Sequence, residues 1–205
     1  MYHFREYQGF FPSTIEAQIL GNIYNELSQK FAVQMLEHFD FDLKFFGIFS
    51  HISIIKPFWS LAISSEKENF QLVAINIQYN FIGGKKGDTL INENQLWGFK
   101  KLKKDYGNLY IREEKLIDKV IELFHSLEID FPQDTEFSKR FYVCSDNENK
   151  TRLALDQNTR TLFCEIPNRE NFIFEIQQNH LVMGNRKPIN EQNAMQIAQF
   201  LNTTI

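Results

Sequence analysis

The chain has 205 residues, of which 43% are hydrophobic and 23% charged, and this composition excludes an intrinsically disordered protein. Its formal net charge of −4 excludes a global positive field that would hold DNA or RNA by counterion release. Two cysteines do not make the disulfide framework of a small secreted domain, and residues 1–6 lack the charged and apolar regions of a signal peptide. We therefore expect one cytoplasmic domain over residues 1–205, with free thiols.

A long N-terminal helix is predicted over about residues 14–38. Ser13-Thr14-Ile15-Glu16 is a capping box, in which the serine hydroxyl and the glutamate carboxylate each satisfy a free backbone amide. The apolar residues that follow at helical spacing are Ile15, Ile19, Ile23, Leu27 and Phe31. This stripe predicts that one side of the helix packs on the core.

From Phe41 the spacing of apolar residues changes from near four to two, which predicts β-strands. The apolar segment 45–64 is predicted as two buried strands joined at Lys56-Pro57, because a charge and a proline are both costly in the middle of a membrane span. Residues 71–82 form the clearest strand, with one apolar and one polar face. The polar residues 65–69 before it predict an antiparallel hairpin.

The glycine-rich residues 83–88 predict a loop, and residues 95–104 predict the next strand. A middle helix is expected over residues 113–127, because apolar residues recur there at helical spacing. Residues 128–137 are acidic and contain Pro132. They mark the joint in the alternative arrangement, in which the chain forms two lobes.

Residues 137–144 predict a strand, and residues 172–176 are expected to pair with 180–183 in a hairpin. Asn190 is the predicted N-cap of a C-terminal helix. Runs of strands between separate helices predict an α+β fold. We expect a largely antiparallel mixed sheet flanked by the long N-terminal helix, the middle helix and the C-terminal helix.

Residues 156–166 fit two structures, a short helix capped by Asp156 or a hairpin that turns at Asn158-Thr159. From Phe41 to Met183 the chain resembles an uncharacterised bacterial family of unknown function, many of whose members follow N-terminal membrane segments. The segments that carry this resemblance are 73–79, 83–86, 109–114, 137–146 and 151–156. The resemblance implies that Asp156 begins a helix. It implies a fold but no site, and the membrane segment is not expected in this chain.

Positive charge gathers on one predicted hairpin, with aromatic side chains between the lysines. The predicted binding residues are Lys85, Lys86, Trp97, Phe99, Lys100, Lys101, Lys103 and Lys104. Such a surface binds a protein partner, an anionic membrane surface or single-stranded nucleic acid, and the protein partner is our leading hypothesis. The alternative is that the lysines only protect an edge strand from pairing, since Lys101 and Lys103 point away from the face of Lys100 and Lys104.

Two patterns suggest enzyme chemistry instead. Cys144 at a strand end is a candidate nucleophile with a histidine as its base. His38, Asp40 and Asp42 are candidate ligands for a metal ion. The loop 83–89 lacks the Gly-Lys-Ser/Thr ending of a nucleotide-binding loop. We therefore expect a non-catalytic cytoplasmic interaction module without a cofactor or metal, with a thiol or metal-assisted hydrolase as the alternative.

Overall fold

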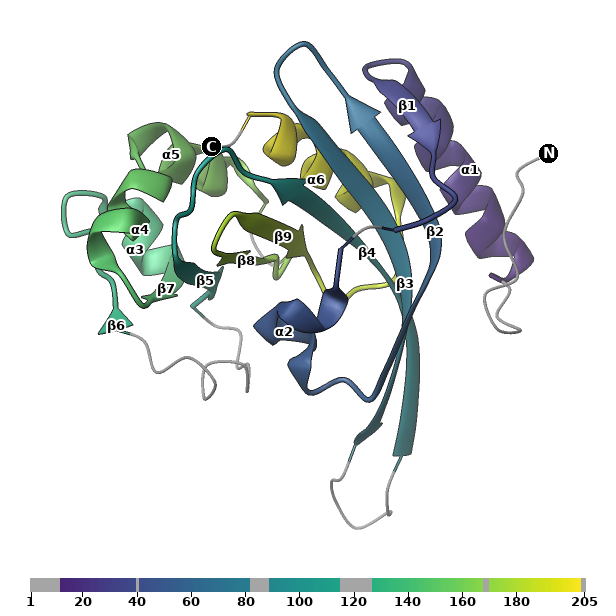
Figure 1. Cartoon of the computed structure of the whole chain (residues 1–205), viewed down its shortest axis with the longest axis horizontal. Coiled ribbons are helices and arrows are strands. Elements are labelled where there is room, and N and C mark those ends of the chain that lie inside the picture. The colour runs from purple at the N-terminus through teal and green to yellow at the C-terminus, as the bar shows by residue number, and fades with distance from the viewer. Residues whose placement is uncertain (1–11, 40, 82–88, 115–126, 168–169, 204–205) are drawn as a thin grey trace.

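Within the described residues, nine strands form one antiparallel sheet in the order β1-β2-β3-β4-β9-β8-β5-β7-β6 (Figure 1). The computed structural model describes residues 12–39, 41–81, 89–114, 127–167 and 170–203. The strands are β1 (Ala32–Met35), β2 (Ile54–Ser64), β3 (Asn69–Phe81), β4 (Thr89–Lys101), β5 (Asn108–Glu113), β6 (Leu127–Glu128), β7 (Phe141–Ser145), β8 (Ile173–Gln177) and β9 (His180–Gly184). The predicted α+β class is confirmed.

All the described helices except α2 begin beside a residue whose side chain caps them. They are α1 (Thr14–Ser28), the 3-10 helix η1 (Leu43–Phe45), α2 (Gly47–Ser50), α3 (Thr135–Arg140), α4 (Glu148–Ala154), α5 (Gln157–Glu165) and α6 (Glu191–Thr203). The capping box is present at α1, where the Glu16 amide donates to Ser13 Oγ at 3.2 Å. Asp156 caps α5 through the Thr159 amide at 2.8 Å, so residues 156–166 begin with a helix as the resemblance implies.

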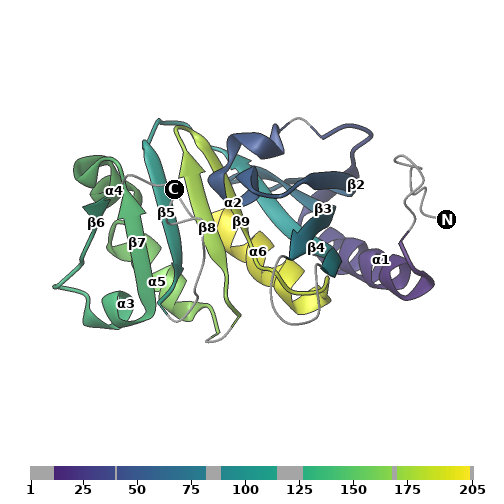
Figure 2. The same ribbon diagram turned by 90° about the horizontal axis from the view of Figure 1, so that it is seen from below.

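The two faces of the sheet have different covers. Helices α1, α5 and α6 pack on the first face, where Leu72, Leu96, Ile111 and Phe174 form part of the main core. The second face is covered by residues 41–52, which include η1 and α2 and are called the cover segment below. Figure 2 shows α1 and α6 on one side of the sheet and α2 on the other.

Aromatic side chains and one carboxylate hold the cover segment on the second face. The rings of Phe49 and Trp97 lie 5.0 Å apart, and those of Phe46 and Phe99 lie 5.8 Å apart. Glu175 in β8 is fully buried and accepts hydrogen bonds from the amides of Gly47 at 2.7 Å and Ile48 at 2.9 Å. This carboxylate therefore satisfies two amides at the start of α2 that have no partner within the helix.

The N-terminal helix is shorter than predicted, because α1 ends at Ser28 and the chain turns into strand β1. The prediction of one helix over 14–38 is wrong for residues 29–38. Phe31, Val33 and Met35 alternate along the chain and all pack against the main core. This period of two decides the structure, although Phe31 and Met35 also continue the helical stripe.

The segment 45–64 does not form two strands joined at Lys56-Pro57. It contains the end of η1, α2 and then a single strand, β2, that runs through Pro57 with a shift in register between Pro57 and Trp59. Strand β1 pairs only with the Leu61–Ser64 part of β2. Strand β3 pairs with one side of β2 along its length, but no described strand pairs with the opposite side beyond β1, so a proline is tolerated on this stretch of the edge.

The hairpin of β2 and β3 is confirmed, but the prediction of a polar face on residues 71–82 is wrong. Leu72 and Ala74 are buried on the first face, and Val73 and Ile75 on the second. Both faces of β3 are therefore interior over most of its length, as the two covers require. A strand buried on both faces reads as a nearly continuous apolar run.

The later elements follow the predictions in part. The hairpin of β8 and β9 and the helix after Asn190 are confirmed. Residues 137–144 form the end of α3 and then β7, because Asp134 caps a short helix before the strand begins. The predicted loop 83–88 and most of the predicted middle helix lie outside the described residues. The predicted joint at 128–137 lies between β6 and β7, which belong to the same sheet.

Candidate binding surface

The aromatic residues of the predicted hairpin lie inside the protein. Trp97 and Phe99 are buried on the second face of the sheet, beneath the cover segment. The indole nitrogen of Trp97 donates to Gln95 Oε1 at 3.1 Å. These two rings are therefore part of the core and not available to a partner in this structure. Lys85 and Lys86 lie outside the described residues.

Lys100 is also an interior residue, although it carries a charge. Its Nζ atom donates to the carbonyl oxygen of Leu201 at 3.0 Å, and it lies 3.4 Å from Glu68 Oε2. Burial lowers the pKa of Lys100, while the nearby Glu68 carboxylate acts in the opposite direction. Leu201 is in the last turn of α6, where a cation stabilises the free carbonyl groups. The role of Lys100 in this structure is therefore to hold α6 on the sheet.

The remaining lysines of the predicted site are exposed at the end of β4. Lys101, Lys103 and Lys104 all reach solvent. Lys103 Nζ lies 3.5 Å from Glu68 Oε1, which brings the end of β4 beside the turn between β2 and β3. Of the predicted binding residues that the structure describes, only these three lysines lie on the surface.

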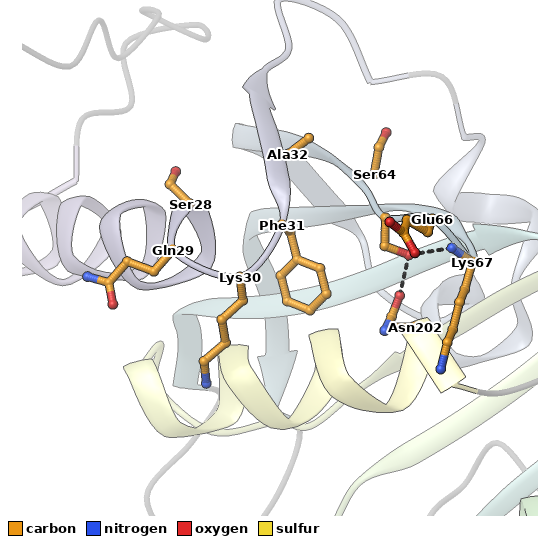
Figure 3. A pocket seen from close by; sticks show the side chains of 10 residues that line it. Ser28, Gln29, Lys30, Phe31, Ala32, Ser64, Glu66, Lys67 and Asn202 are labelled. Carbon is orange, nitrogen blue, oxygen red and sulfur yellow. Dashed lines mark hydrogen bonds between the residues drawn. The ribbon is translucent and has the colours of Figure 1, made fainter.

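A pocket of about 750 Å³ opens at the same end of the molecule. Three segments far apart in the sequence line it, namely residues 28–32 after α1, residues 64–67 after β2, and Asn202 in α6 (Figure 3). The Phe31 ring meets the Phe70 ring edge to face at 6.0 Å. The pocket therefore has one aromatic wall anchored in the core.

Hydrogen bonds fix the turn on the other side of the pocket. Ser65 Oγ donates to Asn202 Oδ1 at 2.6 Å and accepts the amide of Lys67 at 3.0 Å. Figure 3 shows the bond to Asn202, which joins the β2–β3 turn to α6, and the bond to Lys67 within the turn. The backbone that carries the exposed side chains of Glu66 and Lys67 is thus held in one position.

Exposed lysines lie in the lining of this pocket and at the neighbouring end of β4. Lys30 and Lys67 line the pocket, and three lysines at the end of β4 lie nearby. We call this set the basic end, which consists of Lys30, Lys67, Lys101, Lys103 and Lys104. Glu66 is the one carboxylate among the pocket residues, and Glu68 contacts Lys100 and Lys103. The basic end is thus locally positive in a chain of net charge −4. Such an arrangement attracts anionic groups.

The sequence reasoning missed Lys30, Phe31 and Lys67 as members of a site. It placed Lys30 and Phe31 inside a helix, and it treated Lys67 only as part of a polar turn. The alternation of Phe31, Val33 and Met35 is the signal that would have shown the chain leaving the helix. No local pattern shows that α6 brings Asn202 to the same place, because that contact depends on the whole fold.

The candidate nucleophile Cys144 is buried in β7, opposite Tyr110 of β5. A hydrogen bond with Cys144 is the largest of the effects that raise the pKa of Tyr142 to about 12. A thiol in the interior of a sheet is not presented to a substrate, in contrast to the partly exposed thiols of catalytic cysteines. The arrangement around Cys144 therefore gives no support to the thiol hydrolase alternative.

The candidate metal ligands are not gathered into a site. Asp42 accepts the amide of Lys44 at 3.0 Å and caps η1, and His38 is an exposed residue after β1. Asp40 lies outside the described residues. Across the described ranges, no three side chains of His, Cys, Asp or Glu are placed to hold a metal ion. None of the helices in those ranges has the length and apolar character needed to cross a membrane.

Comparison with known proteins identifies the fold. No family model matches the sequence, and no curated protein matches it. The crystal structure of the mycobacterial trehalose monomycolate transport factor A is similar, with a TM-score of 0.55 over 89% of this chain and 90% of that chain. This chain shares its fold with that factor. The sequences are 14% identical, so the similarity describes architecture alone.

Proposed function

We propose that this chain is a non-catalytic interaction module that binds an acidic protein partner at its basic end. The observation that supports this proposal is the pocket beside Phe31, which has Lys30 and Lys67 in its lining and further exposed lysines nearby. An aromatic wall provides an apolar anchor, and the surrounding lysines favour carboxylates. This combination is typical of interfaces in which charge sets the rate and orientation of binding.

The lysines of the basic end can bind a partner at a lower cost in free energy than Lys100 can. Lys100 is already buried and bonded within the fold, whereas Lys30, Lys67 and Lys101 are exposed. Exposed lysines can form ion pairs at the rim of an interface without losing bonds inside the protein, and each such pair contributes about 0.2–1 kcal/mol. Several such ion pairs together make the affinity of the site strongly dependent on salt concentration.

We also propose that the partner is met in the cytoplasm, since both cysteines are free thiols. A binding role agrees with the name of the structurally similar protein, which is a transport factor. An anionic membrane surface or a nucleic acid would be attracted by the same lysines. The mild negative charge of the whole chain favours a local protein contact over either of them.

The test is affinity purification of the full chain from its host with charge-reversal variants. Lys67→Glu/Lys101→Glu should keep the melting temperature of the wild type and lose a co-purified acidic protein. The matched control is Lys56→Glu/Lys139→Glu, which makes the same change in net charge away from the basic end. Recovery of the same partners in equal amounts by the Lys67 and Lys101 variant would contradict the proposal.

A second arm addresses the membrane and nucleic-acid alternatives. Vesicles of phosphatidylcholine with phosphatidylglycerol, and a labelled single-stranded oligonucleotide, are each titrated with the purified chain. We expect no binding of either at physiological salt. Binding of vesicles or of the oligonucleotide that the Lys67→Glu/Lys101→Glu variant loses would assign the basic end to that ligand and overturn the protein-partner proposal.

A further inference from the structure

Among the described residues, strand β1 leaves one side of its backbone unpaired at the edge of the sheet. Its residues pair with β2 in the register Met35 to Leu61, and the next amide, that of Leu36, donates to Ser60 O at 3.0 Å. In an antiparallel ladder alternate residues direct their backbone groups toward the partner strand. Val33 and Met35 therefore direct their N–H and C=O groups away from β2, where no described strand pairs with them.

The other open edges of the described sheet carry features that oppose pairing. The part of β2 beyond β1 contains Lys56 and Pro57 and a shift in register. At the opposite side of the sheet, β6 has only two residues, and one of them is Glu128. Charges, proline, bulges and short length are the usual means by which proteins prevent edge strands from pairing. In contrast, β1 has the sequence Ala-Val-Gln-Met and none of these features except its modest length.

The open edge of β1 leads into the pocket at the basic end. Lys30 and Phe31 immediately precede the strand, and both line the pocket together with Lys67. Figure 3 shows Phe31 and Ala32 at the start of the strand, with Lys67 on the neighbouring turn. A chain that pairs with β1 therefore reaches the lysines as soon as it passes the first residue of the strand.

We propose that an extended acidic segment of the partner adds to β1 as an antiparallel strand, with carboxylates at its C-terminal end beside Lys30 and Lys67. This inference rests on the proposed function and specifies its mode of binding. Antiparallel addition continues the pattern of the sheet, in which every pair of strands is antiparallel. In this orientation the C-terminal end of the added strand passes the N-terminal end of β1, where Lys30 lies.

The first test selects a random peptide library on the purified full chain. Selected peptides should contain alternating β-branched residues followed by Asp or Glu on their C-terminal side. A selected peptide is then synthesised in two N-methylated forms, with methyl groups on alternate residues in one phase or the other. The form methylated on the side that faces β1 should bind at least tenfold more weakly, and the other form should bind like the parent peptide.

The second test changes the protein. Met35→Pro removes one outward N–H group and should weaken binding of the parent peptide about tenfold, since proline fits an extended edge strand but cannot donate. Lys30→Glu/Lys67→Glu should also weaken it about tenfold. Lys139→Glu, an exposed lysine on α3, is the control and should leave the affinity unchanged. The N-methylated peptides keep the test valid if Met35→Pro does not fold.

Three results would overturn the inference. Equal binding of both N-methylated forms excludes strand addition, while the proposed function survives if Lys30→Glu/Lys67→Glu still weakens binding. Selected peptides with acidic residues on their N-terminal side exclude the antiparallel orientation. Dimers of the free chain that Met35→Pro abolishes would show that a second copy, and not an acidic partner, occupies the edge of β1.

Discussion

The two faces of the sheet are covered by different kinds of structure, although both carry a cluster of buried apolar side chains. On the first face, α6 presents a regular apolar stripe to β3, β4 and β9, and α1 packs beside it against α6 and β1. On the second face, the cover segment has only one turn of α-helix and a short 3-10 helix, and it relies on phenylalanines and on the buried carboxylate of Glu175. A regular helix satisfies its own backbone, whereas an irregular segment needs partners from the sheet beneath it.

This difference predicts where the fold depends on many small contacts and where it depends on single residues. Loss of one apolar side chain should cost the same on either face, because both are closely packed. Loss of the polar anchor Glu175 should loosen the cover segment on the second face and leave the helices of the first face in place. The following predictions test this comparison, beginning with the largest expected effect.

Phe163→Ala on the first face and Phe99→Ala on the second should each lower the free energy of unfolding by about 3–5 kcal/mol. The Phe163 ring lies 4.8 Å from that of Phe200, and the Phe99 ring lies 4.9 Å from that of Phe39. Chemical denaturation followed by circular dichroism measures both values. A loss below about 1 kcal/mol for Phe99→Ala would show that the cover segment is only loosely attached.

Glu175→Gln should lower the free energy of unfolding by about 2 kcal/mol, because hydrogen bonds to a charged acceptor are stronger than those to an amide oxygen. Hydrogen exchange should accelerate at the amides of Gly47 and Ile48, which Glu175 binds, and not in α1 or α6. The control is Glu165→Gln, an exposed carboxylate on α5. Uniform acceleration across all helices would contradict a local role.

Gly184→Ala should destabilise the protein by about 1–3 kcal/mol and Gly98→Ala by less. A Cβ atom at Gly184 would lie 2.5 Å from the rigid ring of Trp97 and 2.9 Å from the Leu96 carbonyl oxygen. At Gly98 the three nearest atoms are methyl carbons of the Ile197, Leu201 and Leu72 side chains, which can shift more easily than a backbone carbonyl. Thermal unfolding measures the stability of both variants. A larger loss of stability for Gly98→Ala than for Gly184→Ala would contradict this order.

Tyr142 should ionise above the usual range of a tyrosine, with a pKa of about 12. Its hydrogen bond with Cys144 favours the protonated hydroxyl, so the stability it provides is complete below pH 10 and is lost as the pH rises toward 12. Tyrosinate absorbance during an alkaline titration measures this step. Cys144→Ala should move it to lower pH, and an unchanged titration would exclude the bond as its cause.

The sequence predicted the elements that obey local rules. Ser13 and Asn190 mark helix starts by the chemistry of their side chains, and the structure confirms both. At Asp156 the residues left a helix and a hairpin open, and the structure has the helix. The hairpins of β2 with β3 and of β8 with β9 also follow from alternation and polar turns. Such signals depend on a few neighbouring residues, so they persist whatever the rest of the chain does.

The sequence could not predict what depends on contacts across the fold. Apolar and polar residues alternate over 41–52 as they would in a strand. The carboxylate of Glu175, however, accepts hydrogen bonds from two backbone amides of this segment and favours a helical turn. In the candidate site, the exposure of Lys101, Lys103 and Lys104 was predicted. Burial of Lys100 was not, because its partners are the end of α6 and Glu68.

The order of strands in the sheet has a consequence for how the chain folds during synthesis. Strands β8 and β9 lie between β4 and β5, although they follow both in the sequence. Until the ribosome has released β9, the facing edges of β4 and β5 have no neighbours in the sheet. Such distant pairings form slowly, so the nascent chain carries two exposed β-edges that a chaperone is expected to shield.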